Sequence, residues 1–92
     1  MEKVLARVSS LIDSHRADEA IAEARAWIDG GGAPSDELYY LMGNAWRKKG
    51  DWQKAIDSWL EAVSINPESP AREAIEFADE ILSFYNRDMY NQ

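Results

Sequence analysis

The sequence of 92 residues predicts an all-α fold in which about five helices form antiparallel hairpins within one domain. Two observations lead to this prediction. Apolar residues recur at helical spacing along almost the whole chain, and no segment shows the strict alternation of apolar and polar residues that a strand requires. Turn-forming residues divide the chain where helices should end, at 30–34, 50–51, 66–67 and 69–70.

The first two helices are expected over 2–14 and 17–29. Each carries one apolar stripe with the spacing of a helix face. In the first helix the stripe contains Val4, Leu5, Val8, Leu11 and Ile12. In the second helix it contains Ala20, Ile21, Ala24, Trp27 and Ile28. Because the joint between the two helices is short, they must lie antiparallel.

The third helix is expected over 36–49, and both of its ends can be read from the sequence. Ser35 is placed to cap the first turn, which also carries the acids Asp36 and Glu37. Gly50 follows the last turn, where a glycine commonly ends a helix. The last turn is basic, and with one later residue it forms the single basic cluster of the chain: Arg47, Lys48, Lys49 and Lys54. The helix dipole explains this cluster most simply, and docking of an acidic partner segment is the second interpretation.

The last two helices are expected over 52–65 and 70–85. Asp51 can cap the fourth helix, and Ser69 can cap the fifth with Pro70 at its first position, where the missing N–H costs nothing. The fifth helix has a broad apolar stripe, which is typical of a helix that closes the end of a stack.

A spaced signature within 36–67 resembles the tetratricopeptide repeat. Its members are Tyr39, Met42, Gly43, Trp46, Gly50, Trp52, Ala55, Trp59, Ala62 and Pro67. The resemblance implies helical hairpins stacked as a right-handed α-α superhelix. Independently of it, small Gly43 and Ala55 let two helices approach closely, while the three indoles fill the space beside them.

The same period extends to the rest of the chain in a weaker form. Residues 1–34 are interpreted as a degenerate repeat, because Ala20 and Ile21 stand 35 positions before a matching alanine and isoleucine. At the same offset Gly43 is replaced by Val8 and Gly50 by His15. Residues 35–68 form the well-formed repeat, and 69–92 the closing helix and tail.

The resemblance implies a partner-binding surface on the inner, concave face, which the first helix of each repeat lines. The corresponding residues are Glu37, Tyr40, Asn44, Arg47 and Lys48. The alternative is that they are ordinary solvated residues. A clamp for a C-terminal carboxylate is not expected, because Tyr40 stands where the family members that grip such a carboxylate carry a lysine. The flanking inner positions hold Leu5, Ser9, Ala71 and Ala74. An apolar or aromatic anchor from a partner fits this groove better.

The closing helix offers a second candidate surface. Phe77, Ile81 and Phe84 lie to one side of its main stripe. They either fold onto the neighbouring hairpin near Trp59 and Val63, or form an exposed apolar patch that contacts a second copy of the chain or another partner. Met89 and Tyr90 follow as a tail that is either frayed or docked.

Composition argues against other classes of function. The formal net charge of -7 repels nucleic acid and anionic membranes. Neither a signal peptide nor a membrane anchor is expected, which favours the cytoplasm. The chain has no Cys and one His, His15, at an expected turn, so no catalytic, cofactor or metal site is predicted. The run Gly30–Gly31–Gly32 follows no strand and reads as a linker, not a phosphate cradle. The sequence therefore predicts a non-catalytic scaffold that binds a peptide or helix of another protein, with structural self-association as the alternative.

Overall fold

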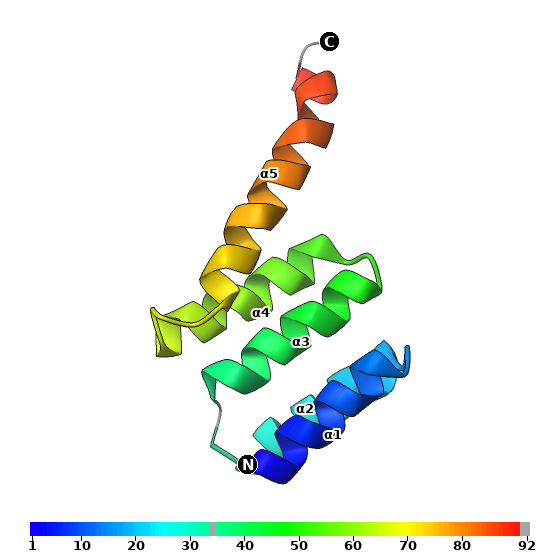
Figure 1. Cartoon of the computed structure of the whole chain (residues 1–92), viewed down its shortest axis with the longest axis vertical. Helices are drawn as coiled ribbons and strands as arrows, with labels where there is room; N and C mark the ends of the chain where they lie inside the picture. The colour runs from blue at the N-terminus through cyan, green and yellow to red at the C-terminus, as the bar shows by residue number, and fades with distance from the viewer. Residues whose placement is uncertain (34, 91–92) are drawn as a thin grey trace.

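The computed structural model describes the backbone of residues 1–33 and 35–90, and the side chains of 1–33 and 35–83. It contains five helices and no strand in these residues: α1 (Glu2–Asp13), α2 (Ala17–Asp29), α3 (Asp36–Lys48), α4 (Trp52–Ile65) and α5 (Ala71–Tyr90). Each helix packs on the next, and α1 also contacts α3 (Figure 1). The predicted all-α fold of stacked helical hairpins is confirmed.

The beginnings of α3 and α4 are capped as the sequence predicts. The Ser35 hydroxyl accepts a hydrogen bond from the backbone N–H of Leu38, and the Asp51 carboxylate accepts one from that of Lys54, both at 3.1 Å. At α5 the prediction was wrong by one residue. The Ser69 hydroxyl accepts from the N–H of Ala71 at 3.1 Å, and the helix begins at Ala71 instead of the preceding proline.

The ends of α1, α2 and α3 share one geometry. Two residues after each helix lies a residue with positive φ: His15 at 63°, Gly31 at 90° and Gly50 at 84°. At each end the N–H of this residue and the N–H of the next residue donate to carbonyls of the last helical turn, over 2.8 to 3.2 Å. This pair of backbone hydrogen bonds is the Schellman motif. His15 thus adopts the conformation that Gly50 adopts 35 positions later, which agrees with the predicted period.

The hairpin of α3 and α4 is built around one indole. Trp59 is 1% exposed and lies against the backbone of Gly43, where a Cβ atom would overlap Nε1 and Cδ1 of the ring. The indole Nε1 donates a hydrogen bond to the backbone carbonyl of Tyr40 at 3.2 Å. Ala55 is fully buried on the facing helix. The predicted close approach of α3 and α4 at small residues is therefore confirmed.

Trp46, at the end of α3, connects the two hairpins. Its ring is buried, and three cations lie over it: Arg25 of α2 at 5.4 Å, Lys49 at 5.0 Å and Lys54 at 4.6 Å from the centroid. Lys49 also forms an ion pair with Asp18. Lys49 thus helps to pack α2 against the second hairpin, whereas Lys54 of α4 covers the same ring from within that hairpin.

The closing helix α5 is longer than the sequence indicates. It was expected to end near residue 85, but it continues to Tyr90, and Figure 1 shows it extending away from the other helices. Residues 86–90 contain no glycine or proline, so nothing in them ends a helix. Met89 and Tyr90 belong to this helix and form no separate tail, and their side chains, like that of Phe84, lie outside the described residues. Ala71 and Ala78 are fully buried, and Ala74 and Ile75 pack against the same core.

Candidate functional site

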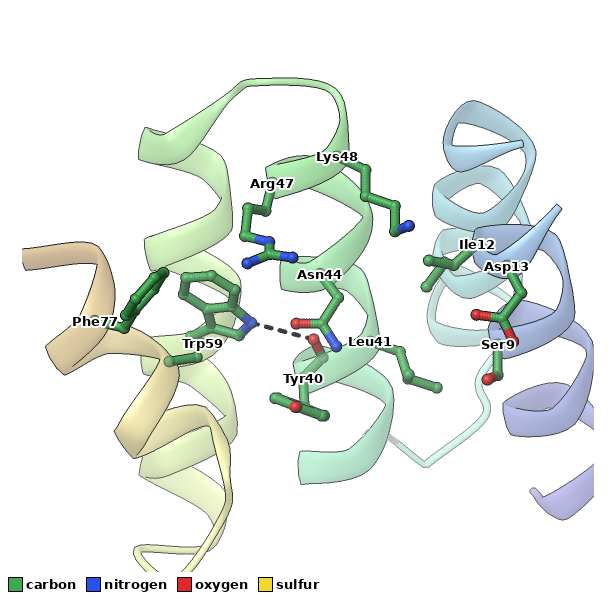
Figure 2. A pocket seen from close by; sticks show the side chains of 11 residues that line it. Ser9, Ile12, Asp13, Tyr40, Leu41, Asn44, Arg47, Lys48, Trp59 and Phe77 are labelled. Carbon is green, nitrogen blue, oxygen red and sulfur yellow. Dashed lines mark hydrogen bonds between the residues drawn. The ribbon is translucent and has the colours of Figure 1, made fainter. Parts of the chain in front are cut away.

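A groove runs along α3, between α1 on one side and α4 and α5 on the other (Figure 2). Its volume is about 320 Å³. Eleven residues from these four helices line it: Ser9, Ile12, Asp13, Tyr40, Leu41, Asn44, Arg47, Lys48, Trp59, Ala74 and Phe77.

The floor of the groove is the exposed face of α3. Tyr40, Asn44 and Arg47 follow one another at one-turn spacing, and Lys48 lies beside the last of them. Tyr40 and Asn44 are half-buried, whereas both cations are exposed. Four of the five predicted groove residues therefore line one cavity. The fifth, Glu37, is exposed and does not line it.

The wall from α1 was only partly foreseen. Ser9 lines the groove as expected, whereas Leu5 is half-buried and does not. Ile12 and Asp13 were not predicted as groove residues, although they stand 35 positions before Arg47 and Lys48. The internal period contains the signal that would have identified them.

The opposite wall is aromatic. Trp59 of α4 and Phe77 of α5 both line the groove, with Ala74 of α5 one turn before Phe77. Phe77 lies next to Trp59 but remains 53% exposed, so the neighbouring hairpin covers it only in part. Ile81, one turn further along α5, is half-buried. The structure thus places Phe77 in the same groove as the predicted residues of α3.

The two cations of the groove extend to opposite sides. Figure 2 shows Arg47 directed toward Trp59 and Phe77, and Lys48 directed toward α1 with Ile12 and Asp13. The described residues form three ion pairs, Arg7–Glu23, Arg16–Glu19 and Lys49–Asp18, and none of them includes a groove cation. Asp13 is the one acid among the lining residues.

Other kinds of site find no support in the described residues. No group of three His, Asp or Glu side chains there has the proximity to hold a metal ion. His15 is an exposed turn residue. The helices of the described part of the chain all lack the long apolar stretch that a bilayer crossing requires.

The chain resembles known proteins in sequence and in structure. The sequence model of the tetratricopeptide repeat family matches residues 36–69. The solution NMR structure of protein BF1650 from Bacteroides fragilis is similar, with 43% identity and a TM-score of 0.83, over 96% of this chain and 89% of that one. No curated protein matches the sequence. The match falls on the hairpin that carries the signature residues and the groove floor, and this chain belongs to the tetratricopeptide repeat family.

Proposed function

We propose that this protein is a non-catalytic interaction module that binds a peptide or helix of another protein in the groove along α3. Tetratricopeptide repeats are typically non-catalytic modules for protein interactions. The observation that supports this site is the convergence of four predicted residues, Tyr40, Asn44, Arg47 and Lys48, on one cavity that also exposes an aromatic side chain.

The groove has the size and chemistry for a short polypeptide segment. From Tyr40 to Lys48 the floor spans roughly 12 Å, which matches about four residues of extended chain or two turns of helix. Phe77, which is 53% exposed, offers apolar area for one anchoring side chain, and Ala74 lies beside it in the lining. The Asn44 amide can donate to and accept from a backbone, which fixes the position of a bound segment.

A selection with phage-displayed random peptides tests the site. We expect the wild-type chain to enrich a set of peptides, and the double variant Tyr40→Ala, Asn44→Ala to lose this enrichment. The matched control is Glu61→Ala, Ser64→Ala, which removes two exposed side chains of α4 outside the groove. Circular dichroism should show equal helicity for all three proteins. Equal enrichment by the groove variant and the control would reject this binding site.

Self-association through α5 is the second candidate function. The observation that favours it is the exposure of Phe77 on a helix that extends beyond the hairpin it packs on. Light scattering at micromolar concentration should then give the mass of at least two chains, and Phe77→Glu should return the mass to that of one chain. A strictly monomeric wild-type protein would exclude this function.

A further inference from the structure

The groove residues also indicate the chemistry of the ligand. We infer that the groove binds an acidic segment of another protein, in which a carboxylate lies next to a large apolar side chain. The carboxylate pairs with Arg47, and the apolar side chain packs against Phe77 and Ala74. This inference rests on the proposed function, since it names the kind of partner that the same groove receives.

The distribution of charge is the first argument. The chain carries a net charge of -7, yet two cations line the groove against one acid, Asp13. Lys49 and Lys54, the other members of the basic cluster, lie over Trp46 instead. Arg47 and Lys48 take part in none of the ion pairs of the described residues, so their charge is available to a ligand. A groove with more positive than negative side chains, in an otherwise acidic protein, favours an acidic segment over a basic one.

The directions of the two cations place the carboxylate. Lys48 extends toward α1, where Asp13 offsets part of its charge (Figure 2). Arg47 extends toward the aromatic wall and has no acid beside it among the lining residues. Because a guanidinium can bind a carboxylate with two parallel hydrogen bonds, Arg47 is the stronger of the two contacts.

The position of Phe77 places the apolar side chain. Phe77 is 53% exposed, and Trp59 and Ala74 line the groove with it. An apolar side chain laid here removes exposed aromatic surface from water. Since Arg47 points to the same wall, the acidic and apolar groups of the ligand must be close neighbours. The acids Glu73 and Glu76 of α5 line a different cavity, at the joint between α4 and α5.

Net charge also favours another protein over a second copy of this chain as the occupant of the groove. A second copy brings the same net charge of -7, so the two chains repel each other at long range. A short acidic segment brings fewer charges and places them on the groove cations. Another protein is therefore the favoured source.

Four fluorescein-labelled nine-residue peptides test the inference by fluorescence anisotropy. Each has a serine–glycine background and a central core: phenylalanine flanked by glutamates, by glutamines or by lysines, and alanine flanked by glutamates. We expect the first peptide to bind about tenfold more tightly than the second and fourth at low salt, a difference of about 1.4 kcal/mol. The preference for glutamate over glutamine should shrink as salt is raised to 0.5 M, because salt screens exposed charges.

Two charge-matched variants locate the effect. Arg47→Gln, Lys48→Gln should remove the preference for glutamate over glutamine. Lys3→Gln, Arg72→Gln removes the same charge outside the groove and should retain the preference. In ¹⁵N NMR spectra, the side-chain N–H signals of Trp59 and Asn44 should shift on addition of the first peptide.

The outcomes separate the two levels of the proposal. If the glutamate and glutamine peptides bind with equal affinity and both shift the Trp59 signal, the acidic preference is wrong and the binding groove stands. If peptides selected from the random library also fail to shift the groove signals, both proposals are wrong. A stable dimer that Phe77→Glu dissociates would overturn the inference, because a second copy would then occupy the aromatic wall.

Discussion

The contact between Gly43 and Trp59 leads to the sharpest prediction. Replacing Gly43 by alanine adds one methyl group where the indole of Trp59 now lies. The new Cβ would overlap Nε1 and Cδ1 and lie 2.8 Å from Cε2. Since carbon atoms in contact prefer about 3.5 to 4.0 Å, the ring has to move by roughly 1 Å or more.

The cost can be worked out from the groups that move. Overpacking of this kind costs about 1 to 3 kcal/mol. The shift also breaks the hydrogen bond from the indole to the Tyr40 carbonyl, which contributes about 1 kcal/mol. Alanine returns about 1 kcal/mol because it favours the helical backbone more than glycine does. We expect Gly43→Ala to lower the free energy of unfolding by about 2 kcal/mol, and the melting temperature by roughly 8 to 16 °C.

A double-mutant cycle with Trp59→Leu isolates this contact. The free energy of unfolding is measured by urea denaturation with circular dichroism for the wild type, both single variants and the double variant. In the leucine background the methyl group has space, so Gly43→Ala should be neutral or stabilising there. An equal cost in both backgrounds would show that the indole does not determine the need for glycine.

Three further predictions follow from other features. His15→Gly should raise the free energy of unfolding by about 0.5 to 1 kcal/mol, because His15 holds a φ of 63° that glycine adopts without a steric penalty, and urea denaturation measures this change. Ser35→Ala should lower it by about 1 kcal/mol, since the cap on the Leu38 N–H is lost, whereas Ser35→Asp should restore most of that loss in the same titration. Phe77→Ser should lower the free energy of unfolding by only about 1 kcal/mol but weaken library-selected peptides at least about fivefold by anisotropy, because Phe77 is about half exposed in the free protein and covered in the proposed complex.

The fold was predictable because its determinants are local. The bounds of α2 and α4 agree with the expected ranges, since their stripes, caps and turns lie within a few residues of each end. The end of α5 was not predictable in this way. No stop signal follows residue 85, and the decline of the apolar pattern is weaker evidence than a glycine or a proline.

The groove was predictable where one helix determines it. The spacing of Tyr40, Asn44 and Arg47 on α3 places them on one face, and the structure brings them to one cavity. The position of Phe77 depends instead on how α5 crosses α4, which the spacing of apolar residues along one helix does not encode. For this reason the sequence indicated that Phe77 lies on a second apolar face, but not that this face opens into the groove.

The attachment of α5 has a thermodynamic consequence for recognition. The face of α5 that packs on the core contains Ala71, Ala74 and Ala78 with Ile75, and an alanine methyl group buries little area. We therefore expect α5 to be held with modest free energy. Phe77 belongs to this helix, so a ligand that contacts both Arg47 of α3 and Phe77 bridges α5 and the hairpin on which it packs. The packing of α5 and the binding of the ligand are then thermodynamically linked. A change that stabilises the packing of α5 raises the affinity for the ligand, and the bound ligand stabilises that packing by the same factor.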